Sequence, residues 1–193
     1  MILFIDTETT GLPTRRNAHH TDLAVWPRIV SINWAIWESP ENEVRNRYYL
    51  IRPDNFIIPH DATRIHGIST QIALRDGKQL RVVLKELLDD ITRYSPLLIV
   101  AHNIEFDIPI VLSELHRAGL PKHIERMPTY CTMVSSTNYC AIPHWNRNGY
   151  KWPTLDELHK KLFGQGHEYS HDAKADLSAC AKCFFRMQEL GLE

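Results

Sequence analysis

Residues 2–11 read ILFIDTETTG, four apolar side chains followed by two carboxylates one residue apart. The short apolar run, Ile2–Ile5, is typical of a buried strand. On a strand, residues i and i+2 point to the same face, so we expect Asp6 and Glu8 to lie side by side. Such a pair is costly at the end of an apolar strand unless a cation lies between the carboxylates. Taken alone, the pair fits a solvated strand end better than a cation site.

The rest of the chain predicts a mixed sheet covered by helices. Together with the first strand, the β-rich runs Ile29–Trp37 and Arg47–Ile51 indicate an antiparallel meander, and Leu97–Ala101 is a further buried strand. Apolar residues at helical spacing predict helices over about 79–94, 108–115, 154–164 and 173–190. The third of these opens on a capping box from Thr154 to Glu157. We expect one α/β domain over residues 1–193.

Composition favours a soluble, cytoplasmic protein with no membrane partner. Apolar residues make up 44% of the chain, and no window reaches the roughly 18 uninterrupted apolar residues that a membrane helix needs. The N-terminus has no basic lead-in of the kind that opens a secretory signal. The net charge is −1, from 22 basic and 23 acidic residues, which argues against tight non-specific binding of long duplex DNA. It leaves room for local contacts to a strand end.

The four cysteines raise the question of a disulfide or a structural zinc site. Cys180 and Cys183 form a C-x-x-C, but they fall inside a helical run, and Cys180 lies on its apolar stripe. We therefore expect free, mostly buried thiols in a reducing compartment.

Two further acids and a histidine stand at the starts of predicted helices. Asp107 lies in the first turn after the strand Leu97–Ala101, His171 precedes the last helix, and Asp176 lies in its first turns. Each alone has a plainer explanation, such as compensation of the helix dipole or a cap. Together with the first pair, the carboxylates would supply hard oxygen ligands for two divalent ions. A histidine, which titrates near neutrality, would take a proton from water, so the set predicts metal-assisted phosphodiester hydrolysis.

Three segments carry a family resemblance. Residues 6–11 (DTETTG), His102-Asn103-x-x-Phe106-Asp107 and His171-x-Ala173-x-x-Asp176 resemble, in order, the three motifs of the DEDDh exonuclease superfamily. This group includes the proofreading subunit of bacterial DNA polymerase III, RNase T, oligoribonuclease and the TREX-type nucleases. The resemblance extends from Ile2 to about Met187 and implies an RNase H-like fold with a five-stranded mixed sheet flanked by helices.

The resemblance also implies roles. Asp6 would bridge two Mg²⁺ ions, for which Mn²⁺ would substitute; Glu8 and Asp176 would hold the ion that activates water, and Asp107 the other. Glu8 and His171 are thus the expected catalytic residues, with His171 as general base. The tyrosine branch of the superfamily places a tyrosine four residues before the last aspartate; that position is Asp172 here, which favours the histidine branch.

The expected substrate contacts are less specific. In the family, the turn at Thr9, Gly11 and Leu12 approaches the terminal nucleotide, and the segment around His66 lies near the 3′ end, with Asp61 upstream of it. Asn103 and Phe106 belong to the second motif. For Gly11 a plain turn, for Asp61 and His66 a structural loop, and for Phe106 core packing are the competing interpretations, and packing is favoured for Phe106.

Two irregular stretches remain open. Residues 145–152 (WNRNGYKW) interleave aromatic and basic side chains, which suits single-strand binding, although a docked surface loop held by Trp152 is favoured slightly. The stretch from Pro13 to Pro27 contains Arg15, Arg16, His19 and His20 and fits either a backbone contact or, slightly better, a solvated loop.

The leading hypothesis is a 3′→5′ exonuclease that releases nucleoside 5′-monophosphates from single-stranded nucleic acid. DNA is favoured over RNA, because oligoribonucleases usually carry Leu-Glu-Met where this chain has Thr7-Glu8-Thr9. The alternatives are an exoribonuclease and a polymerase-associated binding module. The chain ends at Glu193 with no long tail for a polymerase, which favours a free-standing enzyme. The sequence does not indicate an oligomeric state.

Overall fold

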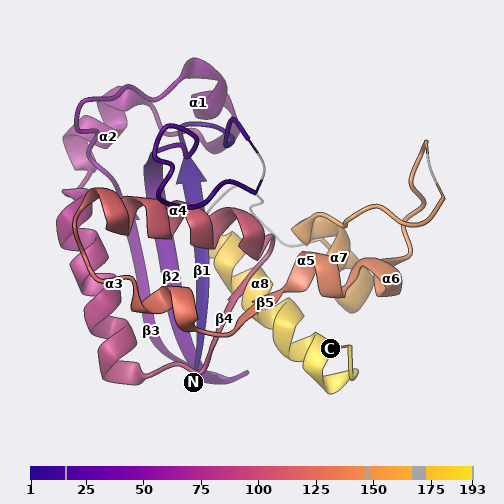
Figure 1. The fold of residues 1–193 in the computed structure, drawn as a ribbon. Helices are drawn as coiled ribbons and strands as arrows, with labels where there is room; N and C mark the ends of the chain where they lie inside the picture. The colour runs from indigo at the N-terminus through magenta and orange to yellow at the C-terminus, as the bar shows by residue number, and fades with distance from the viewer. Residues whose placement is uncertain (16, 147, 167–172, 193) are drawn as a thin grey trace.

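The computed structural model describes residues 1–15, 17–146, 148–166 and 173–192, and it contains one five-stranded mixed sheet in the order β3-β2-β1-β4-β5 (Figure 1). β1 to β3 pair antiparallel, whereas β4 pairs parallel to both β1 and β5. This confirms the predicted fold class. The strands are β1 (Ile2–Thr9), β2 (Ile29–Ser39), β3 (Asn42–Leu50), β4 (Leu98–Ala101) and β5 (Thr129–Cys131).

The four predicted helices are present, with ends shifted by a few residues. Thr154 and Glu157 form the predicted capping box, and Gly164 ends that helix in the left-handed conformation. β5 and several short helices were not predicted from the residue pattern. The helices are α1 (His60–His66), α2 (Thr70–Asp76), α3 (Leu80–Tyr94), α4 (Ile104–Arg117), η1 (His123–Arg126), α5 (Thr132–Ser135), α6 (Thr137–Cys140), α7 (Leu155–Phe163) and α8 (Ala173–Glu189).

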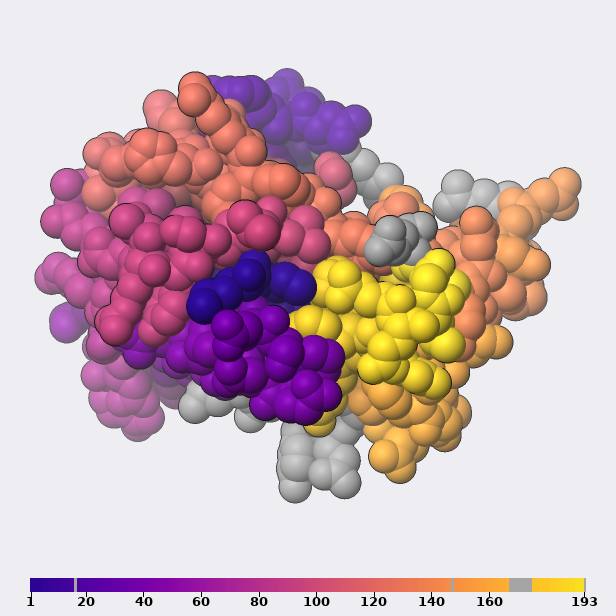
Figure 2. Space-filling view, turned by 90° about the horizontal axis from the view of Figure 1, so that it is seen from below, coloured from indigo at the N-terminus to yellow at the C-terminus, as the bar shows by residue number. Residues whose placement is uncertain are grey.

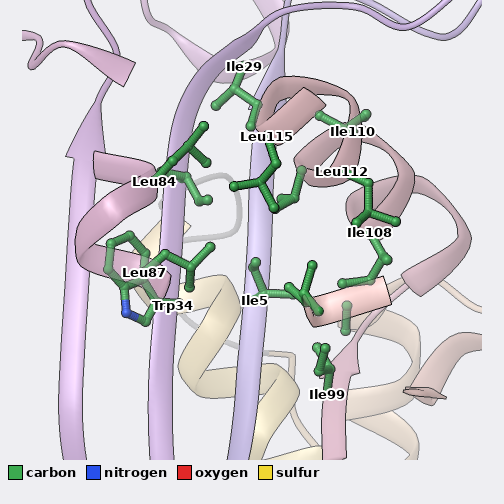
Figure 3. Close-up of a cluster of buried hydrophobic side chains, with 14 of the residues drawn as sticks. Ile5, Ile29, Trp34, Leu84, Leu87, Ile99, Ile108, Ile110, Leu112 and Leu115 are labelled. Carbon is green, nitrogen blue, oxygen red and sulfur yellow. The ribbon is translucent and has the colours of Figure 1, made fainter. Parts of the chain in front are cut away.

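Helices cover both faces of the sheet, and β1 contributes to both cores. Leu3 and Ile5 point to the face covered by α3 and α4, where the largest cluster of buried side chains lies (Figure 3). Phe4 points to the other face and packs edge-on against Phe184 of α8, with ring centroids 5.5 Å apart. Because β1 is buried from both sides, the position of its last residues is fixed by the whole core.

The two ends of β1 have different surroundings. Seen from below, the N-terminal residues lie between the β2–β3 hairpin, the segment that leads into β4, and α8 (Figure 2). The Met1 carbonyl accepts a hydrogen bond from the backbone N–H of Leu97 at 2.9 Å. The carboxyl end of β1, with its acids, is therefore at the opposite edge of the sheet.

The four cysteines are free, as predicted. Burial raises the pKa of the Cys180 thiol well above its ordinary value and that of the Cys183 thiol to about 12. Cys180 packs in the core between sheet and α8, whereas Cys183 packs with Cys140 and Leu158. The two thiols of the C-x-x-C therefore belong to different apolar clusters.

Within the described residues, every helix is too short or too polar to cross a membrane.

Replacing Phe4 by alanine is expected to lower the free energy of unfolding by about 3–5 kcal/mol, because the side chain is fully buried among aromatic rings. Urea denaturation followed by circular dichroism measures the change. Leu97→Ala, at a side chain 75% exposed, is the control and is expected to stay within about 0.5 kcal/mol of the parent chain. A loss below about 1 kcal/mol for Phe4→Ala would contradict this account of the core.

Candidate active site

β1 extends beyond its parallel neighbour β4, so the backbone of its last residues, which carry the acids, has no partner strand on that side. Pairing between β1 and β4 ends at Phe4 and Val100, whereas β1 continues along β2 to Thr9. After β4 the chain turns at Asn103, which adopts a left-handed conformation with φ 85°, and enters α4. Asparagine tolerates this conformation better than most residues. The first turn of α4 thus reaches the unpaired part of β1.

Thr7 attaches α4 to that edge. Its hydroxyl donates a hydrogen bond of 2.7 Å to Oδ1 of Asp107, and the contact is buried. The Thr7 backbone hydrogen-bonds to the same carboxylate. Asp107, which is 3% exposed, therefore accepts hydrogen bonds from a part of β1 that has no partner in β4. This role of Thr7 was not predicted, because a threonine between two acids has no distinctive pattern.

Asp6 and Glu8 point to the opposite face of the sheet from Thr7, toward α8. They alternate with Thr7 along β1 and share the face of Phe4, which packs on α8. Asp176 lies in the first turn of α8, and its charge acts on both Asp6 and Glu8. The structure therefore brings the four predicted carboxylates together.

Burial, together with repulsion between the carboxylates, raises the pKa values of Asp6, Glu8 and Asp107. Burial, followed by repulsion from Asp107, Glu8 and Asp176, holds the pKa of Asp6 well above its ordinary range. Burial and then the charge of Asp176 raise the pKa of Glu8 to about 7. Burial also raises the pKa of Asp107 to about 7, although the hydrogen bonds from Thr7 oppose the shift. Repulsion between these buried carboxylates favours their protonated forms until a cation neutralises them.

The donor set fits a divalent ion of the hard class. Within the described part of the chain, no positive charge contributes to the pKa shifts of Asp6, Glu8 or Asp107. Buried carboxylates that repel one another are stabilised by a cation, and their oxygens are the ligands that Mg²⁺ and Mn²⁺ prefer. Among the described residues, no three of these acids bring their ligand atoms within 4.8 Å of one another.

The predicted base, His171, lies outside the described residues, as does Asp172. Its role therefore stays a prediction from the third motif.

The turn after β1 has the form expected of a substrate loop. The Thr9 hydroxyl donates to the Gly11 carbonyl at 2.7 Å. Gly11 has φ 147°, in the region that favours glycine, and Leu12 after it is 80% exposed. The exposed Leu12 side chain, four residues after Glu8, is free to contact a base. The substrate roles of Thr9, Gly11 and Leu12 remain proposals.

Asp61 and His66 differ in their surroundings. Asp61 is exposed and pairs with Arg64 at 2.8 Å, so its carboxylate lies apart from the acid group. His66, at the end of α1, accepts a hydrogen bond from the Ile68 backbone at 3.1 Å and lies against the Thr9 backbone. Burial lowers the pKa of His66. His66 is thus placed next to the acid-bearing strand, and Asp61 faces solvent.

Phe106 packs against the main core, as its favoured interpretation expected. His102 has a role that the sequence did not reveal. Its Nδ1 lies 3.0 Å from the Thr132 hydroxyl, and its Nε2 lies 3.1 Å from the Pro153 carbonyl oxygen. His102 thereby ties the end of the loop before α7 to the strand end next to the active site.

That loop is more exposed than predicted. Pro143 and Tyr150 form an isolated antiparallel bridge, so the loop is an arm, defined here as residues 141–146 and 148–153; Arg147 lies outside the described residues. Trp145 is 88% and Trp152 60% exposed. The interpretation of a docked loop held by a buried Trp152 is therefore wrong, and its aromatic rings are free to meet a ligand.

The stretch from Pro13 to Pro27 is anchored. Val25 and Trp26 are buried, and Arg117 of α4 donates to the carbonyls of Leu23 and Trp26 at 2.6 and 2.9 Å. The favoured interpretation as a solvated loop is thus wrong for its second half. His19, His20 and Glu125 bring ligand atoms within 4.8 Å, but Lys122 Nζ lies 3.1 Å from Nε2 of the buried His20 and places a positive charge there.

Fold and site together define a class, an RNase H-like domain that gathers carboxylates at the carboxyl end of its central strand. The chain belongs to the RNase_T exonuclease family, whose model matches residues 3–184. The predicted membership of an exonuclease family is thereby confirmed.

Individual relatives cover this domain with low identity. The 3′-5′ exonuclease DinG of Bacillus subtilis strain 168 is 27% identical over 188 residues, which are 96% of this chain and 17% of that protein. Escherichia coli exonuclease I in complex with a dA16 oligonucleotide has a TM-score of 0.75 at 21% identity, covering 97% of this chain and 40% of that one. A product-bound exonuclease I gives 0.73 at 20% identity, covering 99% and 44%. The chain thus spans less than half of either relative, and the likeness to exonuclease I shows the fold.

Asp107→Asn is expected to stabilise the metal-free chain at pH 8 by about 1–3 kcal/mol. The folded pKa of Asp107, about 7, exceeds the ordinary 3.8, so the parent chain loses stability as pH rises between these values. Asparagine removes the charge and keeps an acceptor for Thr7. Thermal unfolding in EDTA from pH 4 to 8 measures the gain, which vanishes near pH 4.

The control is Asp22→Asn, an exposed carboxylate paired with Arg15, which is expected to give no gain. Added Mg²⁺ is expected to raise the melting temperature of the parent chain more than that of Asp107→Asn. A variant less stable than the parent at pH 8 in EDTA would show that the acids do not repel one another as described.

Proposed function

We propose that this chain hydrolyses phosphodiester bonds from the 3′ end of single-stranded nucleic acid, with DNA favoured, and releases nucleoside 5′-monophosphates. The observation that carries the proposal is the convergence of Asp6, Glu8, Asp107 and Asp176 at the carboxyl end of β1, where burial and mutual repulsion raise the pKa values of Asp6, Glu8 and Asp107. The direction of digestion is supported by the Bacillus relative, described as a 3′-5′ exonuclease. The preference for DNA is supported by the exonuclease I complexes with oligonucleotides.

The residues divide the chemistry between them. Asp6 and Glu8 from β1, Asp107 from α4 and Asp176 from α8 would hold Mg²⁺, or Mn²⁺ in its place. When bound, divalent ions would polarise the scissile phosphate and neutralise its developing charge. Thr7 keeps Asp107 oriented and so sets the geometry of the ligands. His171 would accept the proton of the attacking water.

A single-stranded end also suits the surroundings of the acids. Leu12 is 80% exposed on the turn after β1. The arm, which His102 contacts through the Pro153 carbonyl, presents Trp145 and Trp152 to solvent. Exposed rings stack on bases without regard to sequence. A chain with net charge −1 holds a strand end by such local contacts better than it holds a duplex. Location in the cytoplasm remains a prediction.

The first test follows digestion of 5′-labelled single-stranded DNA and matched RNA with Mg²⁺, Mn²⁺ or EDTA. A ladder shortening from the 3′ end is expected only with metal. Asp107→Ala and His171→Ala are each expected to lose on the order of a hundredfold or more in rate, as a metal ligand and a general base. Asp22→Ala, an exposed acid paired with Arg15, is the control.

Faster digestion of RNA would replace the DNA preference by the alternative of an exoribonuclease. If Asp107→Ala and His171→Ala keep the parent rate, the proposed function is wrong. Activity that appears only when a polymerase is added would favour the alternative of a polymerase-associated module.

Trp152→Ala is expected to raise KM for a ten-nucleotide strand by about 5–100-fold, the loss of one base stacked on a ring, with little change in kcat. Trp152→Phe, which keeps a ring, is expected to restore most of the affinity. A p-nitrophenyl ester of thymidine 5′-phosphate has no upstream base and is expected to be hydrolysed equally by all three proteins. An unchanged KM for the ten-nucleotide strand would show that Trp152 of the arm does not contact the substrate.

A further inference from the structure

A cavity that none of the four acids lines lies between the end of α4 and the start of α3. These two helix ends lie close together in Figure 1. The cavity has a volume of about 560 Å³, which is within the usual size of a small-molecule site. Its wall is unusually basic for a chain whose net charge is −1. The charged residues that line it are Arg28, Arg52, Arg81, Arg117, Asp54 and Glu114.

Two of the arginines are fixed in the wall. Arg28 donates through Nε to Glu114 at 2.8 Å, and its guanidinium lies 4.5 Å from the centroid of the Phe56 ring. Arg117 pairs with the same carboxylate at 3.2 Å and also donates to backbone carbonyls. Glu114, which is fully buried, thus fixes the positions of both arginines. Its single negative charge does not neutralise their two positive charges.

The other two arginines are accessible to a ligand. Arg52 and Arg81 are exposed, and within the described part of the chain neither pairs with a carboxylate. Arg81 makes one hydrogen bond, to the Ala118 carbonyl. Guanidinium groups bind phosphate through two parallel N–H donors, which makes arginine the usual residue at such sites.

The start of α3 adds to the positive potential. The N-cap residue Gln79 makes no side-chain hydrogen bond to the helix, and the first turn of this 15-residue helix contains no acid. Gln79 and Leu80 both line the cavity. The first N–H groups of a helix and its dipole favour an anion there.

The wall also contains an unfilled acceptor. Oε1 of Glu114 takes the bonds from Arg28 and from the Ile29 backbone, but Oε2 has no partner among the described residues. A buried carboxylate oxygen is costly without a donor. A nucleotide offers both an anionic phosphate and donors on its base and sugar, whereas a simple anion offers only the first.

Hydrogen bonds link the wall of the cavity to the strand that carries Asp6 and Glu8. Arg28 and Thr10 exchange two hydrogen bonds, of 2.9 and 3.0 Å, and Thr10 follows the last residue of the acid-bearing strand. Asp107 and Glu114 lie seven residues apart on α4, so they share a face and stand about 10 Å apart along its axis. Glu114 in the cavity wall therefore lies about two helical turns from Asp107.

We propose that this arginine pocket, lined by Arg28, Arg52, Arg81 and Arg117, is a second binding site that holds a nucleotide phosphate. In a bound strand this is a phosphate upstream of the scissile bond, and that assignment rests on the proposed function. A free nucleoside monophosphate has the same chemistry, and the experiment separates the two sources.

The test compares binding by Asp107→Asn, which cannot cleave, with binding by the same chain carrying Arg52→Gln and Arg81→Gln. Fluorescence anisotropy of a labelled ten-nucleotide dT strand in Ca²⁺ measures Kd between 50 and 300 mM salt. The two substitutions are expected to weaken binding about tenfold at the lowest salt. They are also expected to reduce the slope of log Kd against log salt by about 0.7 for each phosphate that the pocket no longer neutralises. Arg93→Gln, an exposed arginine at the other end of α3, is the control.

Thymidine 5′-monophosphate, measured by calorimetry on the same proteins, identifies the source. Weakened strand binding with unchanged monophosphate binding assigns the pocket to the strand. Weakened monophosphate binding alone assigns it to a free nucleotide. No change in either overturns the proposal. The test measures binding and not digestion. If the parent chain digests neither DNA nor RNA but the arginine substitutions weaken binding, the proposed function is wrong and the proposed phosphate site is supported.

Discussion

Four carboxylates that repel one another lie at the end of one strand, and the rest of the structure must hold them in place against this repulsion. Asp6, Glu8 and Asp107 would separate if their supports were soft, because burial strengthens the repulsion between them. Each is instead carried on an element held by its own apolar contacts: β1 between two cores, α4 on one face of the sheet. The fold thus stores an unfavourable arrangement that a cation relieves.

The same constraint accounts for the hydrogen bonds around the site. Thr7 holds Asp107 on the open edge of β1, and His102 holds the arm beside the end of β4. Both contacts bring together residues far apart in the sequence. The Thr7 hydroxyl is a neutral donor, so it orients Asp107 without cancelling the negative potential that attracts the ion.

Sequence periodicity was sufficient for the long elements and for the acids. β1, α3 and the capping box at Thr154 follow from local rules, and the motif order pointed to the four carboxylates. β5 was missed because three residues, Thr129–Cys131, carry no periodic signal, and their pairing with β4 is a tertiary event. Trp152 was misjudged because exposure of a ring depends on which surface remains uncovered. Thr7 and His102 act through distant partners that no local pattern identifies.

The burial of β1 on both faces has a consequence for how this domain would inactivate. Asp6 and Glu8 lie on the strand that joins the two largest cores, so the packing of both cores holds them in position. Partial opening that spares the core leaves Asp6 and Glu8 in place. Loss of ligand geometry and global unfolding are then one cooperative event, and heat inactivation follows the melting of the sheet.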